Sequence, residues 1–190
     1  MKSLAGRRFK SLPAHSTENR LLLARAIEVE RGSVGMVTFK VSFATENDLD
    51  LLVGHRVSMW IAIRPELASQ EQEMSALTRD WIKKMLSEGR LIGFIAKTES
   101  EQVAGSGCIW LREQQPRFSD SRLQAPYLMS MYTEEAFRRK GVANLIVQNA
   151  IEWSRSHGYS TISLNASEAG ISLYERFGFK LTTEMRLKIN

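Results

Sequence analysis

Residues 127–157 limit the fold more than any other part of this 190-residue chain. The apolar residues of 127–133 are typical of a strand, and the apolar spacing in 142–157 predicts a helix that ends at Gly158. A short basic turn joins the strand to the helix. Because a strand and an amphipathic helix each bury one face, the pair predicts a layered α/β domain in which helices flank a sheet.

The basic turn has the chemistry of an anion site. The first turn of a helix leaves backbone N–H groups without intrahelical partners, and the helix dipole is positive there. Gly141 has no side chain, so a ligand can approach the backbone closely, and the small Ala143 keeps that approach open. Three positive charges lie beside the glycine, on Arg138, Arg139 and Lys140. The turn therefore predicts a site for a polyanion, most simply a diphosphate.

Spacing alone also fits a solvated basic turn, so both interpretations stay open at this point. The turn matches neither the phosphate-binding loop of nucleotide triphosphatases nor the G-x-G-x-x-G fingerprint of dinucleotide-binding proteins. A site for a nucleoside triphosphate or a nicotinamide dinucleotide is therefore not expected.

The remaining elements follow from the period of the apolar residues. Alternation in 37–43 predicts a strand, and Thr45 with Asp48 three positions on resembles a capping box. We expect further strands at 91–97, 103–111, 161–164 and 185–189. We also expect a helix that follows the capping box and ends at about 63, and two more helices at 69–88 and 172–177. The first two of these strands predict an antiparallel hairpin, and the last is expected to close the sheet. Residues 112–125 are polar and predict an irregular loop of a length that often serves binding.

Several side chains are expected to belong to the core. Helical or strand spacing predicts burial of Trp60, Met74, Leu77, Trp81, Cys108 and Trp110. His55 lies among apolar residues and is interpreted as a partly buried, hydrogen-bonded histidine rather than a catalytic base. The three histidines show no pair at metal-ligand spacing, and one cysteine cannot form a cysteine-based zinc site, so we predict no metal.

The net charge of +5 is concentrated at the start of the chain. Residues 1–36 hold seven basic and three acidic side chains, whereas 37–190 hold 19 basic and 18 acidic. We therefore divide the chain into a basic N-terminal extension, 1–36, partly helical or mobile, and a domain at 37–190. Two interpretations of the extension stay open: a helix at 16–30 that docks or is exchanged in a homodimer, or a stretch upstream of a true start at Met36.

The domain itself shows no charge pattern for a nucleic acid or an acidic membrane surface, so neither partner is expected. No apolar run approaches the ~20 residues of a membrane span, and the first thirty residues lack the roughly 7–15 apolar residues of a secretory signal. A single cysteine cannot form an internal disulfide. These observations predict a protein of the cytoplasm.

Two motifs resemble the signatures of the Gcn5-related N-acetyltransferase (GNAT) family. Arg138-x-x-Gly141-x-Ala143 is similar to the family's [QR]-x-x-G-x-[GA], and the run 164–179, which ends in L-Y-E-R-F-G-F, is similar to its second signature. The motifs stand in the family's order, and weaker resemblance extends back to about Val37. The resemblance implies a mixed, largely antiparallel, twisted sheet flanked by helices. It also implies an acetyl-coenzyme A-dependent N-acetyltransferase.

The resemblance implies a coenzyme site as well. In the family, the strand before the first signature offers backbone groups to the pantetheine arm, and the pyrophosphate lies on the turn that follows. The implied coenzyme-binding residues are Met131, Tyr132, Thr133, Arg138, Arg139, Lys140, Gly141, Val142, Ala143 and Asn144. Acetyl-coenzyme A would then be a co-substrate.

Tyr174 falls where many family members place the general acid that protonates the departing thiolate. A tyrosine that only packs a short helix is the alternative. The chain departs from the family pattern at Ser167, where many members carry asparagine, and at Ile171-Ser172, where relatives often have Arg-Pro. These departures keep open a second function, a coenzyme A-binding regulatory module without transfer activity.

The implied chemistry is direct transfer of an acetyl group to a primary amine, with both substrates held together. An alkyl amine with a pKa of about 10 is mostly protonated at neutral pH, so a base must accept its proton. Glu113, Asp120, Glu134 and Glu135 are candidates for this base by their proximity in sequence. The acceptor, a small molecule or a peptide, should be selected by the first two helices and the loop 112–125.

Overall fold

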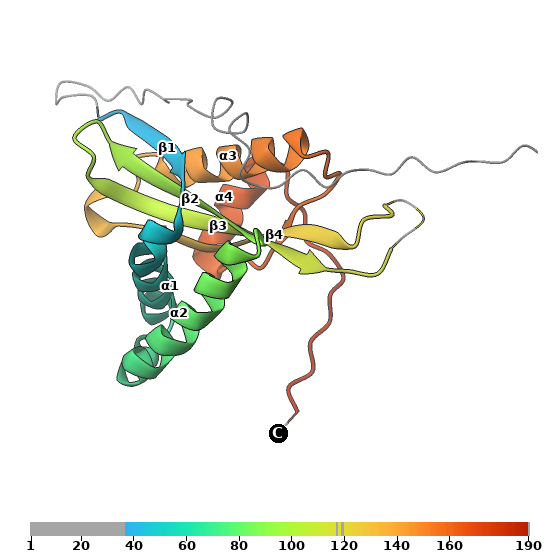
Figure 1. The fold of residues 1–190 in the computed structure, drawn as a ribbon, viewed down its shortest axis with the longest axis horizontal. Coiled ribbons are helices and arrows are strands. Elements are labelled where there is room, and N and C mark those ends of the chain that lie inside the picture. Colours follow the sequence, from blue (N-terminus) through green and yellow to red (C-terminus); the bar gives the residue numbers. More distant parts are fainter. Residues whose placement is uncertain (1–36, 117, 119, 190) are drawn as a thin grey trace, which may run out of the picture.

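A computed structural model describes residues 37–116, 118 and 120–189. The predicted extension, 1–36, lies outside these residues. The described strands form one mixed sheet in the order β1-β2-β3-β4-β5 (Figure 1). The strands are β1 (Phe39–Phe43), β2 (Leu91–Thr98), β3 (Val103–Glu113), β4 (Gln124–Thr133) and β5 (Ser163–Leu164). Neighbours from β1 to β4 are antiparallel, and β5 runs parallel to β4, which confirms the predicted sheet.

Helices cover both faces of the sheet (Figure 1). One face carries α1 (Leu49–Ile63) and α2 (Glu71–Ser87), and the other carries α3 (Val142–Ser156) and α4 (Ile171–Arg176). Short 3₁₀ turns lie at η2 (Glu46–Asp48), η3 (Pro65–Gln70), η4 (Glu135–Phe137) and η5 (Glu168–Gly170). Each face buries its own apolar cluster, so the sheet is the middle layer of three.

Local chemistry explains where the first helices begin and end. The Asp48 carboxylate accepts a hydrogen bond from the Thr45 backbone N–H at 2.7 Å, as the predicted capping box requires. Helix α1 ends at Ile63, before Arg64 and Pro65, because a proline disfavours helical geometry in the residue before it.

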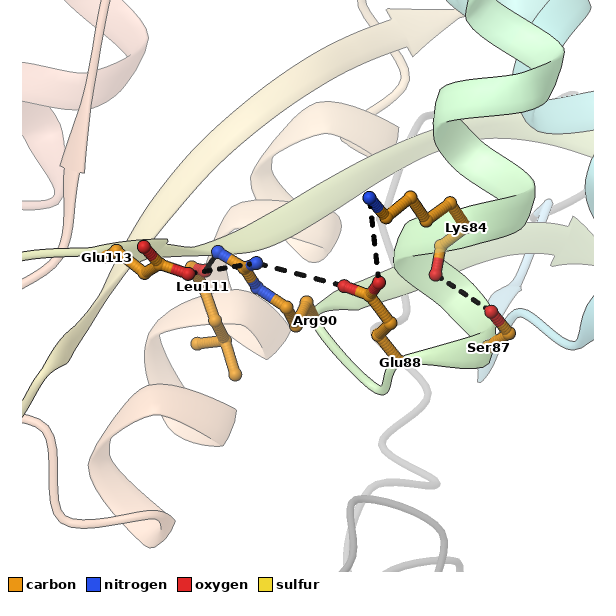
Figure 2. Close-up of polar contacts among 6 residues, drawn as sticks. All are labelled: Lys84, Ser87, Glu88, Arg90, Leu111 and Glu113. Atoms are coloured by element: carbon orange, nitrogen blue, oxygen red, sulfur yellow. Dashed lines mark hydrogen bonds and ion pairs between the residues drawn. The ribbon is translucent and has the colours of Figure 1, made fainter.

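A charged cluster fixes the turn between α2 and β2 (Figure 2). The Arg90 guanidinium lies 3.8 Å from the Glu88 carboxylate and 3.2 Å from that of Glu113, and it donates to the Leu111 carbonyl at 3.4 Å. Lys84 adds a further contact to Glu88 at 3.9 Å. The cluster joins the end of α2 to β3.

The predicted closing strand at 185–189 is wrong. The described residues after Phe179 contain no strand, and the apolar side chains of this tail are 82–94% exposed: Leu181, Met185, Leu187 and Ile189. Figure 1 shows the tail running away from the sheet. Alternation gives a segment the period of a strand, but a strand also needs a partner edge, and β5 offers only two paired residues.

Three predicted core residues are also exposed: Trp60 by 42%, Met74 by 42% and Leu77 by 56%. They share a physical reason. The residues of α1 that are buried lie in its first nine positions, and those of α2 lie in its last six. Figure 1 shows the rest of each helix extending past the sheet, so apolar side chains there have no sheet face to pack against.

Candidate functional site

Strand β4 is paired along one edge and only partly along the other. On the β3 side the pairing runs from Gln124 to Thr133. On the β5 side only Tyr127 and Leu128 are paired. From Met129 to Thr133, no strand of the described residues covers that edge of β4. Its backbone N–H and C=O groups can therefore pair with an extended ligand, as a sheet edge does in strand addition.

A bulge marks the point where β5 separates from β4. The register of the β3–β4 pair shifts between Ser106 and Cys108, and Ser130 has a left-handed φ of 54°. The Ser130 hydroxyl accepts a hydrogen bond of 2.9 Å from the Arg56 guanidinium on α1. The bulge therefore lies beside a positive charge on α1, which belongs to the helical layer formed by α1 and α2.

A cavity of about 500 Å³ opens where the uncovered edge of β4 ends. It lies between the turn that precedes α3 and the helix α4 with its 3₁₀ turn. The lining residues are Thr133, Phe137, Arg138, Arg139, Gly141, Val142, Ala143, Asn144, Ala169, Ser172, Leu173 and Arg176. Since Thr133 is also the last residue of β4, the cavity continues the uncovered strand edge.

Three of the residues that line this cavity stand at the start of α3, where backbone N–H groups lack helical partners. Gly141 has a left-handed φ of 87°, which glycine adopts without the strain of a side chain. The first backbone bond across α3 runs from the Leu145 N–H to the Gly141 carbonyl at 3.0 Å. The N–H groups of Val142, Ala143 and Asn144 therefore have no partner within the helix. They lie at its positive end, where an anion is stabilised.

The charged side chains around the cavity are all basic. Arg138 donates to the Thr133 carbonyl at 3.3 Å, and Arg176 donates to the Asn144 side-chain oxygen at 3.5 Å. Arg139 also lines the cavity. The described residues that line the cavity include no aspartate or glutamate. This arrangement can bind a polyanion such as a diphosphate. Arg176 was not predicted as a site residue, because the short motif that contains it gives no sign that it faces the turn before α3.

Seven of the predicted coenzyme-binding residues line the cavity, and three do not. The backbones of Met131 and Tyr132 belong to the uncovered edge of β4. The Tyr132 ring packs 4.9 Å from the ring of His55, and the Lys140 ammonium lies 5.5 Å from the ring centre of Phe137. The role of all ten residues in coenzyme binding stays a prediction.

Tyr174 lies on α4 and does not line the cavity. Its ring meets the edge of Phe179 at 5.8 Å and packs against the core on the α3 side. Burial raises the pKa of the Tyr174 hydroxyl. Like any tyrosine it is protonated at neutral pH, and the raised pKa makes it a weaker acid than an exposed tyrosine.

His55 is buried and has both ring nitrogens hydrogen-bonded, so the burial and the hydrogen bonds predicted from the sequence are confirmed. Its Nε2 lies 2.9 Å from the Glu134 carboxylate, and its Nδ1 lies 2.8 Å from the Ser106 hydroxyl. A carboxylate only accepts, so Nε2 carries the proton and Nδ1 accepts from Ser106. Burial lowers the pKa of His55, although Glu134 acts in the opposite direction. The neutral ring therefore joins α1 to the end of β4.

The four carboxylates considered as the base do not converge. Glu113 lies 3.2 Å from Arg90, Asp120 accepts the Arg122 backbone N–H at 3.1 Å, and Glu134 contacts His55. Glu135 is exposed at the start of η4. Cys108 is buried, as predicted for a core residue, and burial raises its thiol pKa to about 12. A thiol in this state is a poor nucleophile.

The described residues hold no group of three or more histidine, cysteine, aspartate or glutamate side chains arranged to bind a metal ion. None of the helices in the described ranges is long and apolar enough to cross a membrane.

The fold is that of the GNAT acetyltransferases. The structure superposes on a GCN5-related N-acetyltransferase from Ralstonia eutropha JMP134 with a TM-score of 0.72 and 24% identity, covering 80% of this chain and 98% of that one. A predicted acetyltransferase from Clostridium acetobutylicum, solved with acetyl-CoA, gives a TM-score of 0.68 and 24% identity. The match covers 80% of this chain and 96% of that one.

The sequence defines the family. Residues 56–179 match the model of the acetyltransferase (GNAT) family, and the chain belongs to that family. N-acetyltransferase 8 of Homo sapiens is 27% identical over 129 residues, which are 66% of this chain and 55% of the human protein. The chain thus spans about half the length of this relative.

Proposed function

We propose that this protein is an N-acetyltransferase that moves the acetyl group of acetyl-coenzyme A directly onto a primary amine. The observation that carries the proposal is the continuity of the uncovered β4 edge with the basic cavity at the start of α3. An extended arm ending in a diphosphate matches both features. The solved relative with acetyl-CoA supports this choice of ligand.

In this proposal the pyrophosphate lies on the N–H groups of Val142, Ala143 and Asn144, between Arg138 and Arg176. The pantetheine arm pairs with the uncovered edge of β4. The thioester then lies near the bulge at Ser130, where the Met131 N–H can polarise its carbonyl as negative charge develops on the oxygen. Acetyl-coenzyme A acts as co-substrate, without a metal.

The reaction forms a carbon–nitrogen bond and breaks the carbon–sulfur bond of the thioester. The neutral amine attacks the carbonyl carbon, its surplus proton passes to a base, and the departing thiolate takes a proton from the Tyr174 hydroxyl. A tyrosine hydroxyl is protonated at neutral pH, so it can donate a proton to the thiolate as the thiolate forms. No carboxylate is assigned as the base. A cytoplasmic location remains part of the proposal.

A panel of amines tests the proposal. Purified protein is mixed with acetyl-coenzyme A and each amine, and release of the free thiol is followed. We expect release that depends on both protein and amine. A protein that binds coenzyme A but releases no thiol with any amine would be the regulatory module instead, which the departures at Ser167 and Ile171 favour.

A further inference from the structure

A positively charged surface on the α1 side of the sheet is not used by the coenzyme site. Arg56 reaches from α1 to the bulge of β4, where it donates to the Ser130 hydroxyl at 2.9 Å. Arg112 of β3 lies with its guanidinium 3.9 Å from the ring centre of Tyr127 and donates to the Ser163 hydroxyl at 3.3 Å. These contacts surround the place where β5 separates from β4.

Within the part of the chain that the structure describes, neither arginine has an acidic partner. No ion pair between described residues includes Arg56 or Arg112. The groups beside Arg56 are neutral, since the Cys108 thiol has a pKa of about 12 and Ser130 offers only a hydroxyl. A partly buried guanidinium normally gains a carboxylate, because removing its charge from water is costly.

The remaining donors of Arg56 are in contact with solvent. Its side chain is partly buried, and one nitrogen bonds Ser130. Its other nitrogens have no hydrogen-bond partner among the described residues, and none of them is a buried unpaired atom there. Burial lowers the pKa of Arg56, but it cannot neutralise a guanidinium at physiological pH. A fixed positive charge is therefore open to a ligand beside the bulge.

We infer that Arg56 binds an anionic group of the acceptor, so that the acceptor is an amine that carries a carboxylate or a phosphate, and that Arg112 on Tyr127 adds a second positive charge. The inference rests on the transfer function proposed above, because the thioester is placed at the same bulge. A guanidinium suits both anions, since its planar N–H groups can donate to two oxygens at once. The anion held there orients the amine toward the thioester.

The α1 face that carries Arg56 continues as an apolar surface. Trp60 and Ile63 follow at intervals of four and three residues, which places them on the same side of the helix. They are 42% and 47% exposed. An acceptor with an apolar body would contact this surface while its anion binds Arg56. Phenylalanine is therefore the first probe.

The test compares matched acceptors in the full-length protein. Phenylalanine is paired with phenylalaninamide, and glucosamine 6-phosphate with glucosamine, so that each pair differs in the anion and the two pairs separate carboxylate from phosphate. Wild type is compared with Arg56→Gln, which keeps a donor for Ser130 but removes the charge. Arg64→Gln is the matched control, since Arg64 is exposed just after the same helix.

We expect the anionic member of at least one pair to be preferred, and Arg56→Gln to raise its KM by about 10- to 150-fold, the effect of losing a hydrogen bond to a charged group. The KM for the neutral member and for acetyl-coenzyme A should not change, nor should Arg64→Gln alter either amine. Equal losses on both members, or no preference in wild type, would overturn the inference and leave acetyl transfer standing. Absence of transfer to every amine would overturn both.

Discussion

Tyr174 is the residue for which the sequence makes the sharpest mechanistic prediction. Replacing it with phenylalanine removes the hydroxyl but keeps the ring that packs on Phe179. If the hydroxyl protonates the thiolate, kcat should fall by roughly 10²–10⁴-fold while coenzyme affinity stays unchanged. Steady-state kinetics with the best acceptor, together with a coenzyme titration, measure both quantities. A variant that turns over at the wild-type rate, with chemistry rate-limiting, would show that Tyr174 only packs.

The lowered pKa of His55 makes stability depend on pH. The folded protein takes up the His55 proton at a lower pH than the unfolded chain, whose histidine pKa is about 6.5. The unfolded state therefore binds more protons between the two pKa values, and the free energy of unfolding decreases as pH falls below about 6.5. Above about pH 6.5 the histidine is neutral in both states, so it causes no loss of stability there.

Thermal melts of wild type and His55→Gln across this pH range measure the effect. We expect His55→Gln to be less stable at pH 7, because Ser106 and Glu134 lose a partner, and to lose less stability than wild type on acidification. Parallel curves for the two proteins would contradict the assignment of the neutral ring. The sequence alone predicted a satisfied histidine but could not identify partners 51 and 79 positions away.

Periodicity predicted most strands and helices, and the strand-to-helix turn predicted an anion site at the place where the structure has a cavity. The turn could be predicted because a helix start, a glycine and basic side chains are local features. The uncovered edge of β4 could not, because it depends on where β5 ends its pairing. Arg56 was missed for a similar reason, since only the packed fold brings α1 against the bulge at Ser130.

Gly105 tests how closely the backbone of β4 and the start of α3 approach β3. A Cβ added there would lie 2.5 Å from the Tyr132 carbonyl oxygen and 3.0 Å from the Val142 side chain. Because a backbone atom cannot rotate away, Gly105→Ala should destabilise the protein by about 1–3 kcal/mol. Denaturant unfolding measures the change.

Gly54→Ala is the matched control, because nothing lies within 4 Å of a Cβ at that position of α1. It should leave stability unchanged or raise it by about 0.5–1 kcal/mol, the usual gain over glycine within a helix. Equal effects of the two substitutions would show that β3 and β4 do not pack as closely as described.

The whole molecule divides, in our proposal, at residue 36. Both signatures, and the family match over 56–179, lie after this point. A chain that starts at Met36 should therefore melt at the wild-type temperature and bind coenzyme A with wild-type affinity. A large fall in melting temperature would show that residues 1–35 belong to the core of the domain.

In the proposed site, coenzyme binding by the intact protein depends most directly on Gly141. Its φ of 87° and its place in the cavity lining put a glutamate side chain, with its bulk and negative charge, where the diphosphate is proposed to lie. Gly178→Glu is the matched control: its φ of 86° imposes similar backbone strain, but nothing lies within 4 Å of its Cβ and it does not line the cavity.

The decisive measurement is therefore a calorimetric titration of coenzyme A into the wild type and these two variants. We predict binding to the wild type and to Gly178→Glu with similar affinity, and no detectable binding to Gly141→Glu. Unchanged affinity in Gly141→Glu, with the fold intact, would contradict the placement of the coenzyme at the start of α3.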